Sequence, residues 1–525
     1  MSSRALSRRL ALRWGAVTLG SAAVGSAAVG SAALGSVALS ACSRGSANES
    51  SSEISPFDDE VRAAEQARFH SGRTVERNLT AAPARVSLGA REVDTWSYGA
   101  EAVGPELRIS KGDRLNVLLQ NDLPTETSVH WHGIAIRNDM DGVPPVTQER
   151  IQPGAEFTYD FVAPDHGTYW YHSHSGLQAD RGLFGALVVE DPNDRTGADE
   201  DVVIVIDDWL DGLGTTPDAV LRALSPDVQG GHHGHGGAPP EVDGAEIDSA
   251  AELLASGHGN SEALGGMATH ITYPLHLING RPVEDPFVVS ATAGTRLRLR
   301  VINAGAETPY RFSVAGHEMT VVSADGQDVA YTAGDEILIA PAQRYDVLVT
   351  VQSGSWPIAA KVEGKSGGVA CLLRTPDSVA VVDLTSPAVL SGSGGRLVLE
   401  SELRPSGALE QRAPDRAYSV DLIQAGDRYL WGMAGADAGR LRMKQGERIR
   451  IVMNNDTDMW HPMHTHGHTF SVPSYGGLRR DTVIVLPRTQ MAIDFDADNP
   501  GRWMFHCHNA YHFEAGMTAD LHYVR

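Results

Sequence analysis

One pattern occurs three times in this 525-residue chain and narrows the folds that the chain can adopt. Each copy has a glycine, an arginine two residues later, an apolar run, and an asparagine nine residues after the glycine. The copies are RISKGDRLNVLLQN (108–121), SATAGTRLRLRVIN (290–303) and RMKQGERIRIVMNN (442–455). Alternating polar and apolar residues, as in LRLRV, are typical of strands with one buried face. The repeat therefore predicts three related β domains.

A second motif follows the first in the outer two copies. GTYWYHSH (167–174) and GRWMFHCH (501–508) share a glycine, aromatic residues two and four positions later, and a final His-x-His. The corresponding middle segment, GSWPIAA (354–360), keeps the glycine and the tryptophan but has no histidine. We predict an all-β fold of three consecutive β-sandwich domains, with metal ligands in the first and third. The predicted domains are 76–192, 200–390 and 396–525.

Histidines occupy matching places in the first and third copies. The residue nine positions after the repeat asparagine is His130 in the first copy and His464 in the third, but Phe312 in the middle one. The His-x-His pairs are His130/His132, His172/His174, His464/His466 and His506/His508. This spacing puts both imidazoles of a pair on one face of a strand. Eight imidazoles from two domains predict an interdomain site that suits copper, iron, nickel or zinc.

The stretch HCHNAYHFEAGM (506–517) sets a cysteine between two histidines. Successive side chains of a strand point to opposite faces, so Cys507 would face away from His506 and His508. Two histidines, a thiolate and a weak thioether form the ligand set of blue-copper electron-transfer sites. The residues that supply these groups are His461, Cys507, His512 and Met517. The pattern predicts a second metal site back to back with the histidine cluster.

The motifs HWHG, HSH, HPMHTHGH and HCHNAYHFEAGM, in this order, closely resemble those of the three-domain multicopper oxidases. That family comprises laccases, ferroxidases and cuprous oxidases. The resemblance implies cupredoxin-like Greek-key domains and copper as cofactor, as one type 1 ion, one type 2 ion and a type 3 pair. It implies type 1 ligands His461, Cys507 and His512, with Met517 axial, and type 2 ligands His130 and His464. The implied type 3 ligands are His132, His172, His174, His466, His506 and His508.

The resemblance also suggests residues that deliver protons. Asp141, in MDGVP, aligns with a family carboxylate that assists proton delivery near the type 2 site, although an Asp-Gly turn would also explain it. Many bacterial members have a glutamate directly after the second type 1 histidine. This chain has Phe513 there and Glu514 one residue later, so Glu514 is the candidate substitute.

Several other residues are given structural roles. His166, His270, His276, His317 and His468 are expected to be structural imidazoles. Cys371, in GVACLLRT, lies in an apolar run and is predicted to be a buried core thiol. Trp131 and Met463 lie between predicted ligands and are expected to pack in the core.

The N-terminus carries export signals. SRRLALR (7–13) resembles a twin-arginine signal, and residues 1–41 are predicted to be a signal peptide. LSAC (39–42) resembles a lipobox, which implies a lipid anchor at Cys42 on the extracytoplasmic side of the membrane; ordinary cleavage without lipid is the alternative. Residues 42–75 are expected to form a tether. The protein is expected to be a monomer in the cell envelope.

Domain 2 contains a polar insert at about 212–268. Its segment GGHHGHGGAPP (230–240) includes His232, His233 and His235, which could capture copper; a glycine-rich surface loop is the alternative. The net charge of −23 argues against nucleic acid as a partner, because phosphate binding needs an excess of lysine and arginine.

The expected activity is one-electron oxidation of a substrate at the type 1 site, through Cys507, coupled to four-electron reduction of O₂ to water. Cu(I) and then Fe(II) are the favoured substrates, in copper resistance. Acidic or thioether groups near the type 1 edge, such as Asp458 or Met459, could bind the ion, although a β-turn would explain them as well. The alternatives are a laccase-like oxidase of phenols and a copper-sequestering surface protein.

Overall fold

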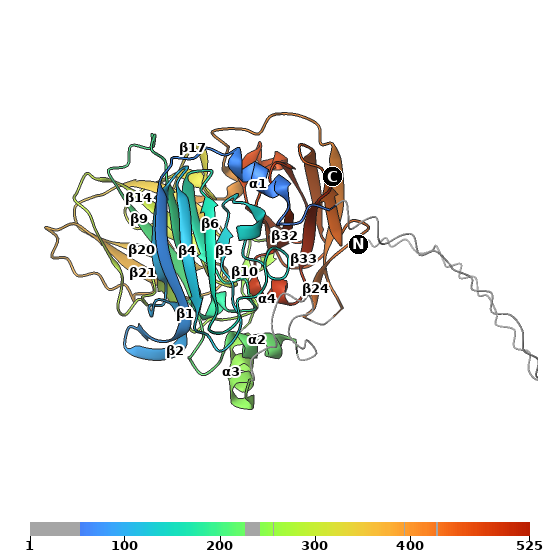
Figure 1. Cartoon of the computed structure of the whole chain (residues 1–525). Coiled ribbons are helices and arrows are strands. Elements are labelled where there is room, and N and C mark those ends of the chain that lie inside the picture. Colours follow the sequence, from blue (N-terminus) through green and yellow to red (C-terminus); the bar gives the residue numbers. More distant parts are fainter. Residues whose placement is uncertain (1–52, 226–241, 256, 393, 427–428) are drawn as a thin grey trace, which may run out of the picture. The chain divides into compact units, whose positions relative to one another are not determined.

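The described part of the chain contains six sheets, two in each of three domains, and one short hairpin (Figure 1). The computed structural model describes residues 53–225, 242–255, 257–392, 394–426 and 429–525. In each domain, one core cluster contains side chains from both sheets. The prediction of three β-sandwiches in an all-β chain is confirmed.

Domain 1 has two four-stranded sheets. The first sheet contains, in spatial order, β2 (Arg91–Tyr98), β1 (Thr74–Leu88), β4 (Arg114–Asn121) and β6 (Glu156–Val162). The second sheet contains β3 (Gly104–Ser110), β8 (Phe184–Glu190), β7 (Gly167–His172) and β5 (His130–His132).

Domain 2 has two six-stranded sheets. The first contains β12 (Leu275–Ile278), β9 (Glu200–Trp209), β14 (Arg296–Asn303), β19 (Arg344–Thr350), β16 (Met319–Ala324) and β17 (Gln327–Gly334). The second contains β13 (Val288–Ser290), β21 (Gly368–Arg374), β20 (Ser355–Val362), β15 (Tyr310–Val314), β18 (Glu336–Ile339) and β22 (Leu397–Val398).

Domain 3 has a six-stranded and a five-stranded sheet. The first contains β24 (Trp431–Ala434), β23 (Arg416–Gln424), β26 (Arg448–Asn455), β31 (Gln490–Asp496), β28 (Phe470–Val472) and β29 (Leu478–Arg480). The second contains β25 (Arg440–Met443), β33 (Thr518–Tyr523), β32 (Arg502–Cys507), β27 (His461–Thr465) and β30 (Thr482–Val485). The helices and the hairpin are α1 (Asp59–Gln66), α2 (Pro217–Leu224), α3 (Gly244–Ala255), α4 (Ala510–Glu514), β10 (Asn260–Ser261) and β11 (Gly266–Met267).

The repeated segment forms an equivalent strand in each domain. In each domain, this strand pairs in parallel with the first strand of that domain and antiparallel with a later strand. The three equivalent strands are β4, β14 and β26. The glycine that precedes each strand has a positive φ, of 85°, 91° and 88°, in which a side chain would be strained. These glycines are Gly112, Gly294 and Gly446. One turn geometry therefore starts all three strands.

The repeated asparagine ties the end of this strand to the next loop. The side-chain Nδ2 of Asn121 donates to the carbonyls of Thr125 and Ile151, at 3.0 and 2.8 Å. In domain 3, Asn455 donates to the carbonyl of Met459 at 2.8 Å in the same way. Both asparagines are buried, so their amide groups need such partners. This contact places the segment that leads to the first histidines of each ligand-bearing domain.

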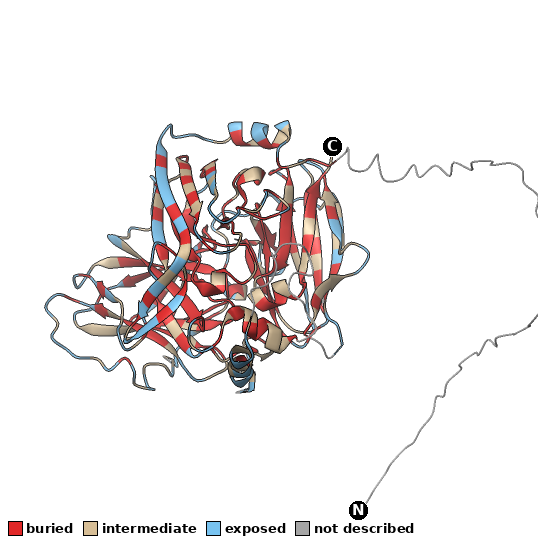
Figure 2. Ribbon diagram, turned by 60° about the horizontal axis from the view of Figure 1, so that its bottom comes forward, coloured by how far each residue is buried: buried red, intermediate tan, exposed pale blue. Residues whose placement is uncertain are grey.

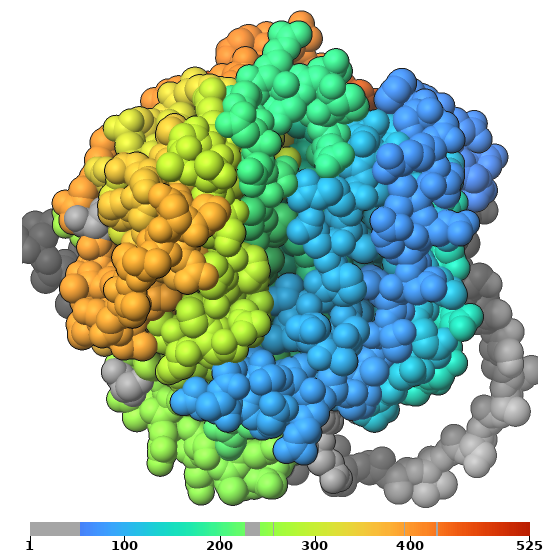
Figure 3. All heavy atoms as spheres, turned by 90° about the vertical axis from the view of Figure 1, so that its left-hand side faces the viewer, coloured from blue at the N-terminus to red at the C-terminus, as the bar shows by residue number. Residues whose placement is uncertain are grey.

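Buried residues line the inner faces of the strands, as Figure 2 shows in red. Apolar side chains also join the domains: Trp170 and Phe184 of domain 1 pack with Val203, Val205 and Ile302 of domain 2. Figure 3 shows residues of domain 1 (blue) beside those of domain 2 (yellow-green to orange). Burial of apolar surface between domains stabilises their contact.

Two expectations about boundaries need correction. The expected tether, 42–75, contains α1, and Arg68 beyond it contacts Glu65 and Asn499, so this part is folded against domain 3. The predicted start of domain 3 at 396 is too early, because β22 pairs with β18 of domain 2. The described part of the insert forms α2, α3 and the hairpin, and its apolar residues pack in the core cluster of domain 3. Long-range packing, and not local composition, decides these boundaries.

Candidate metal centre

Strand pairing brings the histidines of each domain together. In domain 1, β5 and β7 are antiparallel and place His130 opposite His172. In domain 3, β27 and β32 place His464 opposite His506 in the same way. The equivalent pair in domain 2 is Phe312 opposite Ala360, on β15 and β20. The same register therefore presents candidate metal ligands in domains 1 and 3 and apolar residues in domain 2.

The eight histidines meet between domains 1 and 3. The ring centroids of His130 and His466 are 3.9 Å apart, and those of His132 and His464 are 3.8 Å apart. Ring nitrogens of His174, His466 and His506 all lie within 4.8 Å of one another. The ring centroids of His132, His172 and His508 are 4.9 to 5.8 Å apart. The eight rings thus form one continuous cluster, in which the ring centroids of His130 and His464 are 6.0 Å apart.

Hydrogen bonds hold several of these imidazoles through one ring nitrogen. Nδ1 of His130, His172 and His464 donates to backbone carbonyls at 2.8 to 2.9 Å. Their Nε2 atoms are buried without a hydrogen-bond partner in the part of the chain that the structure describes. His132 is reversed: Nε2 lies 3.3 Å from Asp481, and Nδ1 has no such partner among the described residues. A buried ring nitrogen without a hydrogen-bond partner fits a metal site when the other nitrogen of the same ring is hydrogen-bonded and so orients the imidazole.

Burial favours the neutral form of several of these imidazoles, and a histidine must be neutral to bind a metal. Seven of the eight side chains are buried, with at most 5% of their surface exposed, and His508 is partly exposed. Burial, and then the neighbouring imidazoles, hold the pKa values of His132, His466 and His506 well below the ordinary value of 6.5.

The second site lies on the opposite face of β32, as predicted. Cys507 Sγ is 3.7 Å from Nδ1 of both His461 and His512, and these two nitrogens are 3.1 Å apart. Met517 is fully buried and its carbonyl accepts from the backbone N–H of Cys507 at 3.1 Å. Asn509 caps α4 through its Oδ1, which accepts from the backbone N–H of His512 and sets that residue in place. Two imidazoles and a thiol, with the buried Met517 as the candidate thioether ligand, fit a blue-copper site.

We expect the copper-free protein to lose stability as the pH falls below about 6.5. Burial lowers the pKa of His461 to about 3, whereas the same group in an unfolded chain titrates near 6.5. Between these values the unfolded chain binds a proton that the folded protein does not, so stability present above pH 6.5 is lost on acidification. His461 alone accounts for roughly 2 kcal/mol at pH 5.

Urea unfolding of the copper-free protein at pH 7 and pH 5 measures this loss. A His461→Leu variant removes the titrating group and serves as the control, since its stability should differ less between the two pH values. Equal stability of the wild-type apoprotein at both pH values would contradict the prediction.

Asp141 lies where a proton-delivery residue of the cluster is expected. Its Oδ2 accepts from His466 Nδ1 at 2.9 Å, and its Oδ1 is 3.3 Å from His130 Nδ1. Glu514, at the end of α4, is partly exposed, and burial of its carboxyl raises the pKa to about 7. The α4 ring that lies against His174 and His506 belongs to Phe513, with centroid distances of 5.2 and 4.8 Å.

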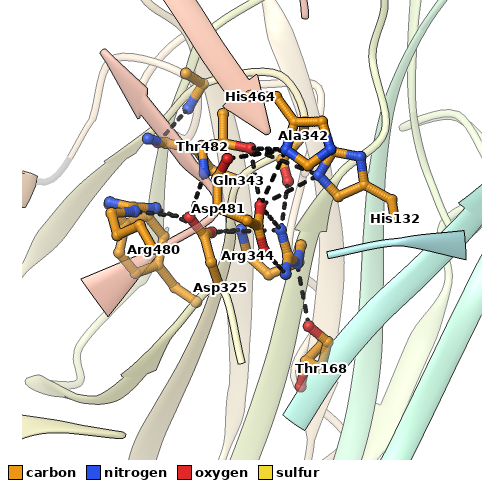
Figure 4. Close-up of polar contacts among 12 residues, drawn as sticks. His132, Thr168, Asp325, Ala342, Gln343, Arg344, His464, Arg480, Asp481 and Thr482 are labelled. Atoms are coloured by element: carbon orange, nitrogen blue, oxygen red, sulfur yellow. Dashed lines mark hydrogen bonds and ion pairs between the residues drawn. The ribbon is translucent and has the colours of Figure 1, made fainter. Parts of the chain in front are cut away.

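A buried ion pair behind the cluster joins domain 2 to domain 3 (Figure 4). Arg344 of β19 contacts both carboxylate oxygens of Asp481, at 2.6 and 2.8 Å. Asp481 Oδ1 lies 3.3 Å from His132 Nε2 and 3.5 Å from His464 Nδ1. Burial disfavours the charge on Asp481, but the Arg344 guanidinium holds the pKa of its carboxyl well below the usual range. One carboxylate therefore orients imidazoles of domains 1 and 3, and domain 2 supplies its counter-charge.

Other groups near the second site did not follow from sequence reasoning. His270, expected to be only structural, has its ring centroid 5.4 Å from that of His512. Glu307 accepts from His270 Nδ1 at 3.0 Å and is fully buried. These residues lie far from His512 in the sequence, and no local motif marks them.

The expectation for Cys371, Trp131 and Met463 is confirmed, since all three are fully buried.

Some predicted features lie elsewhere. Asp458 is exposed and pairs with Arg488 at 2.8 Å, whereas Met459 is buried. Cys42 and the histidine tract, His232, His233 and His235, lie outside the described residues. Among the described residues, no helix is long and apolar enough to cross a membrane.

Comparison with known proteins gives consistent matches. Family models described as multicopper oxidase match residues 80–194, 249–375 and 416–524. The chain is 40% identical to multicopper oxidase MmcO of Mycobacterium tuberculosis, covering 88% of this chain and 90% of that protein. It is 27% identical to copper resistance protein A of Escherichia coli, covering 85% and 92%. The structure of a mutant laccase from Botrytis aclada matches with a TM-score of 0.69 and 25% identity, covering 87% and 89%.

The matched segments fall one in each domain, and the ligand-bearing motifs lie in the first and third of them. The family uses copper, which the clustered imidazoles and the buried thiol of Cys507 suit. On these grounds the chain belongs to the multicopper oxidase family, and it is an oxidoreductase with copper as its cofactor.

Proposed function

We propose that this chain is an exported oxidase that takes electrons from Cu(I), and next from Fe(II), and uses them to reduce O₂ to water in copper resistance. Bound copper supplies the redox chemistry at both sites. The proposed type 1 ligands are His461, Cys507 and His512, with Met517 axial. The proposed type 2 ligands are His130 and His464, and the type 3 ions are held by His132, His172 and His508 and by His174, His466 and His506.

The burial of the His512 side chain is the observation that supports the proposed choice of substrate. The His512 side chain has no exposed surface. Trp431 covers it with a centroid distance of 4.1 Å, and Tyr429 and His270 lie at 5.8 and 5.4 Å. A phenol ring has no direct access to this imidazole. A small ion needs only one or two donor atoms at the surface, so the arrangement favours a metal ion.

His258 and His270 offer a place for such an ion. His258 is exposed, and its ring centroid is 5.6 Å from that of His270, which in turn lies against His512. Burial opposes ionisation of Glu307, but hydrogen bonds from His270 and from backbone amides hold its pKa below the ordinary value. A negative charge beside His270 favours a cation there. Electrons would pass from this point to His512 and through Cys507 to His506 and His508.

The relatives' names and the N-terminus support the cellular role. Two matched proteins are named for copper resistance or as a multicopper oxidase, and the laccase match keeps phenol oxidation as the alternative. The twin-arginine signal and the lipobox at Cys42 support export and a lipid anchor. Asp141, with its contacts to His130 and His466, is assigned to proton delivery, and the partly exposed Glu514 to proton supply.

The test is O₂ uptake by the copper-loaded protein, supplied in turn with Cu(I), Fe(II) and a methoxyphenol. Each rate is corrected for oxidation without protein and for a Cys507→Ser control. We expect the metal ions to give the higher kcat/KM. A higher value for the phenol would overturn the substrate assignment in favour of a laccase. Uptake that stops once the added Cu(I) is bound would favour sequestration.

Replacing His270 with phenylalanine should raise KM for Cu(I) by about tenfold, which corresponds to about 1.4 kcal/mol, with little change for the phenol. The reason is that His270 would bind the ion, whereas the phenol has no site there. His317→Phe is the matched control, because His317 contacts the carbonyl of Ala315 in domain 2, at 2.8 Å. Unchanged KM for Cu(I) in the His270 variant would contradict the assignment.

A further inference from the structure

A small cavity lies beside the histidine cluster. Its volume is about 50 Å³, and its walls include His172, His174, His506, His508, Phe513 and Asp180. This volume can hold water, which needs roughly 10–15 Å³. Reduction of O₂ to water consumes four protons, so a cavity that reaches the cluster is a place where protons can arrive. Phe513, which faces the cluster here, has no proton to give.

Asp180 is the carboxyl on the wall of this cavity. It belongs to a short 3₁₀ turn, Ala179–Arg181, and is only 5% exposed. Its Oδ2 accepts from the hydroxyls of Tyr511, at 2.6 Å, and Tyr273, at 3.3 Å. Its Oδ1 is buried and has no hydrogen-bond partner among the described residues. A protonated Oδ1 could donate to a water in the cavity, which would satisfy both atoms.

The surroundings favour the neutral acid. Burial raises the pKa of Asp180 well above the ordinary value, and the nearby carboxylate of Asp208 acts in the same direction. The adjacent Arg181 makes its ion pairs with Asp211 and Asp218, at 2.8 and 2.6 Å. The other groups that face Asp180 are the hydroxyls of Tyr511 and Tyr273, the carboxyls of Asp207 and Asp211, and the imidazoles that share its cavity.

Tyr273 connects Asp180 to a second, larger cavity. This outer cavity has a volume of about 230 Å³ and is lined by Tyr273 together with polar groups that include His276, Glu284 and Lys365. A polar cavity of this size holds several waters. Tyr273 thus lines the outer cavity and its hydroxyl contacts Asp180, which lines the cavity beside the cluster.

We propose that Asp180 is the proton donor for O₂ reduction on the side of the cluster that Phe513 covers. The O–H bond at Oδ1 breaks as a cavity water accepts the proton. A new O–H bond forms at Oδ2 as the Tyr273 hydroxyl gives its proton to that oxygen and takes one from water of the outer cavity, and rotation of the carboxyl group then returns the proton to the cavity side. No electron moves in this step, because the electrons come from the substrate. The inference rests on O₂ reduction at the cluster, as proposed above.

The test is a single-turnover reoxidation of the fully reduced, copper-loaded protein by O₂. Asp180→Asn keeps the shape and accepts hydrogen bonds but cannot donate the proton. We expect reoxidation at least about tenfold slower than in the wild type, with unchanged copper content and unchanged anaerobic reduction by substrate. The wild-type rate should fall as the pH rises and Asp180 ionises, whereas the variant rate should not follow that curve. Asp207→Asn, which removes a buried carboxyl outside the cavity lining, is the matched control and should behave as the wild type.

A second measurement does not depend on turnover. Infrared spectroscopy of the copper-free protein should show the carbonyl band of the protonated Asp180 carboxyl. This band should be absent in Asp180→Asn. It should be present in Asp207→Asn, although the total intensity of protonated-carboxyl bands should be lower in that variant. Wild-type reoxidation kinetics and pH dependence in the Asp180 variant would overturn the proposal, and so would the lack of an Asp180 carbonyl band. Failure of the wild type itself to consume O₂ would instead overturn the proposed function.

Discussion

Replacing Cys507 with serine should abolish the blue colour and reduce oxidase activity to that of a protein-free control, while copper at the histidine cluster stays bound. The thiolate is the strong ligand of the blue-copper set, and a serine hydroxyl cannot replace it. Cys507 lies 3.7 Å from both His461 and His512, and electrons from any substrate would pass through it to His506 and His508. The eight imidazoles of the cluster are untouched by the change.

The visible absorption near the blue band, the copper content and O₂ uptake measure these effects together. Cys371→Ser is the matched control, because Cys371 is also a fully buried thiol but lies in the core of domain 2. It should keep colour and activity. Blue absorption that survives in the Cys507 variant would show that the type 1 assignment is wrong.

Replacing Arg344 with methionine should destabilise the protein by about 3–5 kcal/mol, because it leaves the buried charge of Asp481 without its partner. Neither side chain is exposed by more than 1%, so water cannot replace the guanidinium. Asp481 Oδ1 also lies 3.3 Å from His132 Nε2 and 3.5 Å from His464 Nδ1. If the carboxylate becomes protonated or turns away, it releases one imidazole of domain 1 and one of domain 3. We therefore expect loss of copper from the cluster in the folded variant.

Arg480→Met separates the loss of copper from the loss of stability. Arg480 is equally buried, but its partners are Asp325 and Glu400, at 2.7 and 3.0 Å. Thermal unfolding should show similar destabilisation in both variants, whereas copper content and the type 2 electron paramagnetic resonance signal should fall further in the Arg344 variant. An equal loss of copper in both would contradict a specific role for Arg344.

Sequence reasoning was most successful where a side chain's role depends on near neighbours in the chain. The repeat predicted the strands β4, β14 and β26, because alternation of polar and apolar residues reflects which face of a strand is buried. The spacing of HCH likewise separated Cys507 from its flanking histidines, and the structure places that thiol with His461 and His512. The described histidines of all four pairs come together as predicted.

Roles that depend on packing between distant segments were not predictable in this way. Residues 59–66 lie in a stretch expected to be a tether, and they form a helix whose segment packs on domain 3. His270 received only a structural role, because nothing local shows that it lies against His512. No sequence motif indicates a role for Asp180, because the cavity and the hydroxyls of Tyr511 and Tyr273 beside it come from distant segments.

The sequence by itself determined the three-domain β architecture, the candidate copper ligands as a set and the family resemblance, because strand periodicity and ligand spacing are local properties. Only the tertiary structure decided which imidazole rings lie against one another, which carboxyl lines the cavity beside the cluster, and that domain 2 supplies Arg344 to hold Asp481. The physical reason is that the stability of a buried charge, and the direction of an imidazole, depend on atoms brought within about 3 Å by folding. Those atoms come from residues more than a hundred positions apart.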